Sequence, residues 1–325
     1  MPAFFGLRFD FRNPAFGNAS MADRYAAAIE MAEWADNLGC INILVSEHHG
    51  SADGYIPSPL PMVAAMAART TNVRFLVGAL IAPFYDPIRV AEDLIVIDVI
   101  SRGRVDVIVA GGYVREEFAM YGVPIAERAS RVTEMVHTLK AAFTGKPFAY
   151  RDREVHITPA PFRPGGPSVL LGGSSEVAAR RAARIADGFV PSVPEVWDFY
   201  RDEAQKLGRP DPGPSVVGAS RTVALAVDPE VGWTQMSPFF AHETNAYGAW
   251  QAQDDIATGY RTTENIDDLR AAGQYDVVSP AQLVDELRGA PFPFVMLHPL
   301  CGGMPIDLAW ESLKLFESQV LPAFA

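Results

Sequence analysis

Short runs of apolar residues bounded by glycine or proline alternate along the chain with longer stretches in which apolar residues recur at helical spacing. Residues 21–38 and 58–69 are two of the helical stretches, and Pro87 begins another at the helix position where proline costs least. This alternation is typical of βα units repeated around a parallel sheet. The eight strands that it predicts cover residues 3–9, 41–46, 73–81, 104–110, 168–172, 188–191, 216–227 and 292–297, and the last helix covers 308–319.

Two stretches interrupt the alternation. Residues 144–167 contain five prolines and alternate apolar with polar positions, which predicts a hairpin insertion after the fourth strand. Residues 236–274 are rich in Asp, Thr, Gly and aromatic residues, and they predict an excursion of loop and helix after the seventh strand, at the barrel mouth. Because no change of composition marks a linker, residues 1–325 are expected to form a single domain.

The strand count favours a (β/α)8 TIM barrel over an open doubly wound sheet. An open sheet that binds a dinucleotide normally carries GxGxxG in its first βα turn. In this chain that turn, residues 10–14, reads DFRNP and holds no such glycines. The predicted fold is therefore an α/β barrel with insertions after strands 4 and 7.

Charge and cysteine content narrow the range of partners. The chain carries 27 basic and 39 acidic side chains, and the resulting charge of −12 repels nucleic acid and anionic lipid surfaces. No run of about 18 uncharged apolar residues occurs, so no membrane span is expected. The two cysteines, Cys40 and Cys301, are too few for a disulfide framework and lie outside any metal-ligand spacing. A cytoplasmic protein without a metal is expected.

The densest polar cluster follows the second predicted strand. Active groups of such barrels lie at the carboxyl ends of strands, and here Glu47, His48 and His49 bring a carboxylate and two imidazoles to that position. Imidazole titrates near neutral pH, so the cluster is a candidate for proton transfer. An alternative is a zinc site of a barrel hydrolase, since imidazole and carboxylate also bind zinc. Such a site usually adds HxH after the first strand, where this chain has residues 8–10, RFD.

A second candidate site precedes the helix that begins near Glu176. Gly172, Gly173, Ser174 and Ser175 place unpaired amides and two hydroxyls near one point, which suits a phosphate. The same residues are also compatible with a glycine turn and serine N-caps. Three arginines that follow in the helix are expected to form a solvated face: Arg180, Arg181 and Arg184.

Four segments in order resemble one protein family. They are SEHHG at 46–50, GALIAPFYDPIRVAEDL at 78–94, SRGRVDVIVAGGYVREEFAMYG at 101–122 and LGGSSEVAARRAARIADG at 171–188. Together they resemble the bacterial luciferase-like flavin-dependent oxidoreductases, and the carboxyl-terminal segment is similar as well. The resemblance implies a (β/α)8 barrel that binds reduced flavin mononucleotide (FMN) or, in another branch, the deazaflavin coenzyme F420.

The resemblance also implies roles for individual residues. His48 matches the histidine beside the reacting face of the flavin, as acid, base or hydrogen-bond donor, with His49 and Glu47 around it. Gly78 and Ala79 match the third-strand bulge against which the flavin ring packs, with a non-proline cis peptide between them. The phosphate is expected at residues 172–175.

The match departs from luciferase after the fourth strand. Where luciferase carries a phosphate-binding arginine, this chain reads Ala110, Gly111 and Gly112, so contact from that strand is expected to come from its backbone alone. Aromatic residues at strand ends and polar residues after the seventh and eighth strands are candidates for contact with the substrate. These candidates are Phe84, Tyr113, His242, Tyr247 and His298.

The leading hypothesis is therefore a monooxygenase that uses reduced FMN from a separate flavin reductase, together with O2, to oxidise a small organic substrate. One alternative keeps the barrel and uses F420 for hydride transfer. A metal-dependent hydrolase and a flavin-binding protein without catalytic activity are further alternatives. The resemblance also implies a homodimer.

Overall fold

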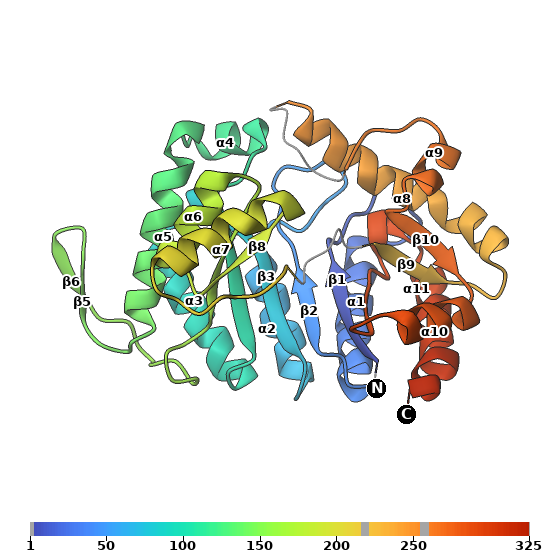
Figure 1. The fold of residues 1–325 in the computed structure, drawn as a ribbon, viewed down its shortest axis with the longest axis horizontal. Coiled ribbons are helices and arrows are strands. Elements are labelled where there is room, and N and C mark those ends of the chain that lie inside the picture. The colour runs from blue at the N-terminus through green and yellow to red at the C-terminus, as the bar shows by residue number, and fades with distance from the viewer. Residues whose placement is uncertain (1–2, 216–220, 254–259, 325) are drawn as a thin grey trace.

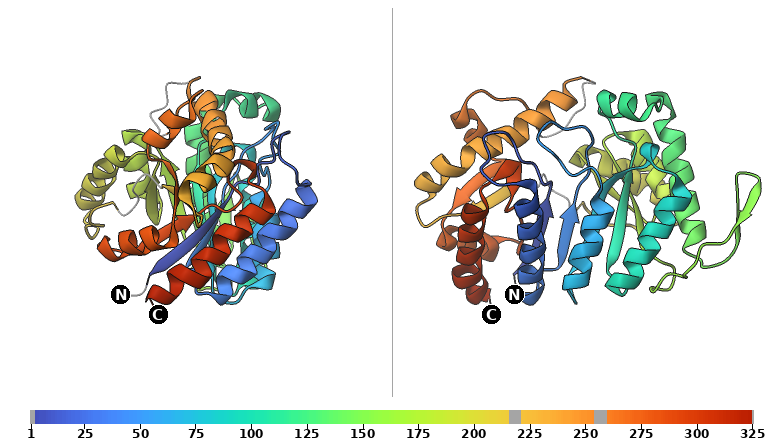
Figure 2. Two further views of the ribbon diagram at one scale, coloured as in Figure 1. Left: turned by 90° about the vertical axis from the view of Figure 1, so that its right-hand side faces the viewer. Right: turned by 180° about the vertical axis from the view of Figure 1, so that it is seen from behind.

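The computed structural model describes residues 3–215, 221–253 and 260–324. In these residues nine parallel strands form one sheet, in the order β10-β9-β11-β1-β2-β3-β4-β7-β8. Helices cover the outside of the sheet (Figures 1 and 2). The strands are β1 Phe4–Phe9, β2 Asn42–Val45, β3 Arg74–Ile81, β4 Val105–Ala110, β7 Val169–Gly173, β8 Gly188–Pro191, β9 Thr222–Leu225, β10 Tyr275–Val278 and β11 Phe294–Leu297.

Most helices begin where the sequence supplies a cap. Pro87 follows Asp86, whose carboxylate accepts the N–H groups of the first turn of α3, and Ser279 forms a capping box at the start of α10. No helix among the described residues has the length and apolarity needed to cross a membrane. The helices are α1 Met21–Asn37, α2 Pro59–Arg69, α3 Pro87–Ser101, α4 Arg115–Tyr121, α5 Arg128–Ala142, α6 Glu176–Ile185, α7 Trp197–Lys206, α8 Pro229–Gln251, α9 Ile266–Ala271, α10 Pro280–Gly289 and α11 Ile306–Leu315.

The fold is the predicted (β/α)8 barrel with one additional strand. Each of the eight predicted strands is present, although residues 216–220 of the seventh lie outside the described part of the chain. The additional strand is β10, which pairs with β9. It directly follows residues 236–274, the stretch predicted to form an excursion of loop and helix. Strands β8 and β10 form the two edges of the described sheet.

Both predicted insertions are present. Strands β5 Phe148–Tyr150 and β6 Arg153–Val155 form an antiparallel hairpin that projects from the barrel (Figure 1). The excursion predicted for residues 236–274 contains the second half of α8 and all of α9, and its residues 254–259 lie outside the described part. Helix α8 begins before the predicted start, and its buried face repeats every seven residues at Trp233, Phe240 and Tyr247.

The strands of the barrel bury both of their faces. In β4, Val105, Val107 and Val109 are fully buried, whereas Ile108 and Ala110 line an interior cavity. The alternation places one set of side chains against the outer helices and the other set toward the barrel axis. The packing of the outer helices against the strands thus fixes the positions of the candidate site residues.

Asp36, near the end of α1, shapes the turn that leads into β3. Its carboxylate accepts the backbone N–H groups of Thr71, Asn72 and Val73 at 2.8, 2.8 and 2.6 Å. Burial alone would raise the pKa of Asp36, but these hydrogen bonds lower it. Asp36→Ala is expected to lower the free energy of unfolding by about 2 to 3 kcal/mol at pH 7, because three N–H groups lose their acceptor.

Urea unfolding of Asp36→Ala, with the exposed Asp285→Ala as control, measures this loss. Because the pKa of Asp36 is lowered in the folded state, its contribution is complete above the unfolded pKa of about 4 and disappears as the pH falls through the folded value. The difference between wild type and variant should therefore shrink below about pH 4. A difference that grows in acid would contradict this account.

Candidate active site

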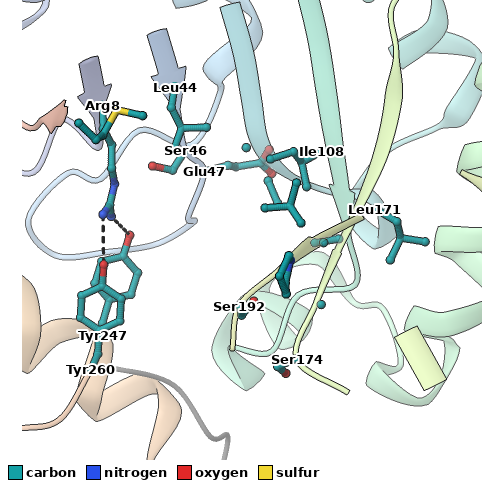
Figure 3. Close-up of a pocket in the computed structure, with 18 of the residues that line it drawn as sticks. Arg8, Leu44, Ser46, Glu47, Ile108, Leu171, Ser174, Ser192, Tyr247 and Tyr260 are labelled. Atoms are coloured by element: carbon teal, nitrogen blue, oxygen red, sulfur yellow. Dashed lines mark hydrogen bonds between the residues drawn. The ribbon is translucent and has the colours of Figure 1, made fainter. Parts of the chain in front are cut away.

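A cavity of about 1740 Å³ lies inside the barrel and reaches the carboxyl ends of the strands (Figure 3). Pockets for one small ligand usually measure roughly 300–1,000 Å³, so the space is sufficient for two such molecules. Residues from the edge strand β8 and from β9, which lies next to the other edge, line it, including Val190 on β8 and Val223 on β9. From the predicted site, the lining includes Glu47, His48, Gly78, Ala79, Ala110, Gly111, Gly112, Tyr113, Gly172, Gly173, Ser174, Ser175 and Tyr247.

His48 lies in the cavity wall with one ring nitrogen held by an acid. Its Nδ1 is 2.8 Å from Oε1 of Glu117, and the same oxygen accepts the backbone N–H of His49 at 2.8 Å. Glu117 thus fixes the hydrogen on Nδ1 and leaves Nε2 as an acceptor. Burial lowers the pKa of His48, while Glu117 opposes this shift. The imidazole is therefore neutral at pH 7.

Aromatic rings surround His48 on several sides. The His48 ring stacks on Trp250 with centroids 4.3 Å apart, and it meets the rings of Tyr55, Tyr113 and Tyr247 nearly edge-on. The structure thus brings two predicted substrate contacts, Tyr113 and Tyr247, to the candidate catalytic histidine. The rings restrict the orientation of the imidazole.

Glu47 and His49 form a second pair next to His48. The His49 Nε2 atom is 2.7 Å from Glu47 Oε1, and its Nδ1 atom is 3.0 Å from the Tyr121 hydroxyl. Burial raises the pKa of Glu47, and His49 opposes this. Glu47 lines the cavity, but His49 lies behind it, where Phe84 packs against the His49 ring.

Gly78 and Ala79 form a side-chain-poor surface in the middle of the cavity wall. The peptide between them is cis, as the resemblance implied, and the register of β3 against β4 shifts between Gly78 and Leu80. A Cβ atom on Gly78 would lie 2.5 Å from Leu44 Cδ1 and 2.9 Å from Ile108 Cδ1. A side chain at position 78 would therefore displace Leu44 and Ile108, which both line the cavity.

Hydroxyls and guanidinium groups gather at the end of β7. Ser174 and Ser175 line the cavity, and the Ser175 hydroxyl caps α6 by accepting the N–H of Ala178 at 3.3 Å. Arg128 at the start of α5 and Arg181 in α6 line the same cavity. These groups and the helix N-terminus suit an anion.

The prediction that all three arginines of α6 form a solvated face is wrong for Arg181. Arg180 and Arg184 bind Glu203 on the outside of the barrel, whereas Arg181 faces the cavity. Arg128, which the sequence did not indicate, lies beside Gly111, where a Cβ atom would be 3.6 Å from Arg128 Cβ. The positive charge near the end of β4 is therefore supplied by the Arg128 side chain, from the start of α5.

His242, His298 and Phe84 do not line the cavity in the part of the chain that the structure describes. The His242 Nε2 atom is 2.7 Å from Asp53. His298 is buried between two acids, with Nε2 3.6 Å from Asp10 and Nδ1 3.5 Å from Glu243. The structure thus places these three predicted substrate contacts outside the cavity lining.

The described residues do not form the zinc site considered as an alternative. His49 faces Glu47 while His48 faces Glu117, so the three candidate ligands do not converge. Ligand atoms do lie within 4.8 Å of one another at Glu243, His298 and Cys301. The Arg8 guanidinium, 3.1 Å from Glu243, places a fixed positive charge beside that group and disfavours a metal ion there.

Comparison with known proteins identifies the family. The sequence profile of the luciferase-like monooxygenases matches residues 5–289. The chain belongs to this family. One relative is the oxygenase component of a flavin-dependent trigonelline monooxygenase from Acinetobacter baylyi. It is 32% identical to this luciferase-like monooxygenase over 330 residues, and the alignment covers 93% of this chain and 90% of that protein. Family membership makes the chain an oxidoreductase.

Solved structures of similar proteins share the fold. Monooxygenase RslO1 from Streptomyces bottropensis has a TM-score of 0.79 at 24% identity, covering 99% of this chain and 100% of that one. The oxygenating constituent of 3,6-diketocamphane monooxygenase from Pseudomonas putida, in complex with FMN, has a TM-score of 0.72 at 19% identity over 99% of both chains. An F420-dependent secondary alcohol dehydrogenase has a TM-score of 0.68 at 14% identity over 100% of both.

Proposed function

We propose that this luciferase-like monooxygenase binds reduced FMN in the barrel cavity and uses it with O2 to oxygenate a small organic substrate. One observation carries the proposal: a single cavity joins the Gly78–Ala79 surface, a neutral His48 and an anion-binding end at Ser174. The Gly78–Ala79 surface suits a flat ring, His48 suits proton transfer beside that ring, and the end at Ser174 suits a phosphate. When bound, reduced FMN supplies the two electrons with which O2 delivers one oxygen atom to the substrate and the other to water.

The protein residues orient the ligands and handle protons. Ser174 and Ser175 with the amides of α6 hold the phosphate, and Arg128 and Arg181 neutralise its charge. His48 accepts a proton at Nε2, since Glu117 keeps the hydrogen on Nδ1. Glu47 and His49 fix the loop that carries His48. The aromatic rings around His48 exclude water from this part of the cavity.

A separate flavin reductase is the proposed source of reduced FMN. The name of the Acinetobacter baylyi relative, an oxygenase component, supports this division of labour. A homodimer is proposed as well, and light scattering of the purified protein measures it.

Anaerobic titration of the purified chain with reduced FMN, FMN and F420 tests the proposed coenzyme. Saturable binding of reduced FMN, tighter than that of F420, is the expected result. Binding of F420 without any response to either form of FMN would instead assign the site to F420-dependent hydride transfer. Failure of all three to bind would refute the proposal.

The two cavity arginines are expected to contribute most of the phosphate affinity. A hydrogen bond to a charged group is worth about 1.5 to 3 kcal/mol, so Arg128→Met and Arg181→Met should each raise the dissociation constant of FMN about tenfold or more. Riboflavin, which has no phosphate, should bind each variant as it binds the wild type. Flavin fluorescence quenching measures both affinities.

Arg180→Met is the matched control, because Arg180 lies one residue away in the same helix but binds Glu203 outside the cavity. It should leave the FMN affinity unchanged. Equal losses for FMN and riboflavin in the two cavity variants would show that the phosphate is bound elsewhere.

A further inference from the structure

Arg8 of β1 reaches the cavity on the side opposite Ser174 and Ser192 (Figure 3). Its Nη1 donates to the Tyr260 hydroxyl at 3.1 Å, and its Nη2 donates to the Tyr247 hydroxyl at 3.2 Å and to Glu243 at 3.1 Å. The side chain keeps 11% of its surface exposed. Because Arg8 lines the cavity, part of a permanently charged group is presented to whatever binds there.

Glu243 fixes the guanidinium from behind. The Glu243 side chain is fully buried, and its second oxygen accepts the Tyr275 hydroxyl at 2.8 Å and the Cys301 thiol at 3.0 Å. These bonds prevent the carboxylate from turning toward the cavity. Arg8 therefore holds one orientation before any ligand arrives, which lowers the entropy cost of binding.

Arg8 has donors that the protein does not use. A guanidinium carries five N–H groups, and three hydrogen bonds are made to Tyr260, Tyr247 and Glu243. Among the residues that the structure describes, no acceptor pairs with the Nε–H or with the second Nη1–H. A ligand oxygen would supply the missing acceptor, whereas an apolar ligand would leave both donors desolvated and unpaired.

The wall next to Arg8 is aromatic. The rings of Tyr247 and Tyr260 stack with centroids 4.4 Å apart at an angle of 25°, and the rings of Tyr55 and Tyr113 line the cavity nearby. Aromatic faces pack best against other planar rings. The wall therefore favours a planar ring over a bulky saturated one.

We propose that Arg8 determines which substrates the cavity accepts, by binding a carbonyl or carboxylate oxygen on a planar ring that packs against Tyr247 and Tyr260. The inference rests on the proposed function for the reaction that follows binding. Arg8 is a specificity residue and Glu243 is a positioning residue, because Glu243 binds Arg8 but does not itself line the cavity.

Three probes of similar size test the proposal on the full chain with FMN bound: benzoate, acetophenone and ethylbenzene. Ligand-observed NMR measures their affinities without requiring turnover. Benzoate and acetophenone should bind about tenfold or more tightly than ethylbenzene, and Arg8→Met should abolish this difference. Equal affinities of the three probes for the wild type, or an unchanged preference in Arg8→Met, would overturn the proposal.

Two further variants serve as controls for Arg8→Met. Arg8→Met leaves Glu243 buried without its cation, so the double variant Arg8→Met/Glu243→Gln removes both charges and must show the same loss of preference. Arg153→Met, in the hairpin outside the cavity, should keep the preference of the wild type.

FMN titration of each sample separates the two proposals. Wild-type protein that prefers the oxygen-bearing probes but binds no FMN would refute the proposed function and leave the role of Arg8 intact. Protein that binds FMN but shows no dependence on Arg8 would refute only the role of Arg8.

Discussion

Replacing His48 by glutamine is expected to lower kcat/KM by about 100- to 10,000-fold, the range typical for the loss of a general acid or base. Glutamine can still form hydrogen bonds, but it cannot take up a proton. In the wild type, Glu117 holds Nδ1 at 2.8 Å and burial lowers the pKa of His48, so Nε2 is ready to accept a proton at neutral pH. Oxygen consumption with substrate and a flavin reductase measures the effect.

The pH profile distinguishes a loss of proton transfer from a loss of packing. The kcat/KM of the wild type should fall as the pH drops through the pKa of His48, which lies below the usual 6.5. This acid limb should be absent in His48→Gln, while the FMN affinity stays close to that of the wild type. His137→Gln, on the exposed face of α5, serves as control. Activity of His48→Gln within about threefold of the wild type would exclude this role.

Arg12→Met is expected to lower the free energy of unfolding by about 3 to 5 kcal/mol, the cost of breaking a buried ion pair from one side. The fully buried guanidinium binds Asp53 and lies 3.6 Å from Asp10. Burial would raise the pKa of Asp10, but His298 and then Arg12 lower it to about 2. Methionine would remove the guanidinium from both carboxylates.

The same substitution should disturb the surroundings of His48. The Arg12 guanidinium lies 4.7 Å from the ring centroid of Tyr55 and 4.9 Å from those of Tyr247 and Trp250, and these rings contact His48. Activity should therefore fall together with stability. Denaturant unfolding measures the loss.

An exposed arginine provides the comparison for Arg12. Arg89 on α3 binds Asp93 at 2.8 Å with 70% of its side chain exposed, so Arg89→Met should cost less than about 1 kcal/mol. If Arg12→Met and Arg89→Met lost similar free energies of unfolding, burial would not determine the strength of these ion pairs.

The strands and the loops that follow them could be predicted because both signals are local. Apolar runs show where strands lie, and the carboxyl ends of parallel strands must converge at one end of a barrel. This reasoning placed Glu47, His48, Gly78 and Ser174 at one end of the barrel, and in the structure all four line the same cavity. The sequence did not indicate strand β10, whose four residues, with Asp276 among them, directly follow the stretch 236–274 that predicts an excursion of loop and helix.

The partners of the site residues could not be predicted, because they are set by contacts between distant repeats. Glu117 lies 69 positions after His48, and Glu243 lies 235 positions after Arg8. No local pattern relates such pairs. Arg181 illustrates the same limit, since its helical spacing is shared with Arg180 and Arg184 and only the packing of α6 against the barrel shows which of the three faces inward.

A crystal structure of the chain grown with saturating FMN would show where and how the flavin binds. We expect the flavin ring against Gly78 and Ala79, His48 at its edge, and the phosphate within hydrogen-bonding distance of Ser174 and Arg128. A flavin bound outside the barrel, or one whose phosphate lies away from the start of α6, would contradict this expectation.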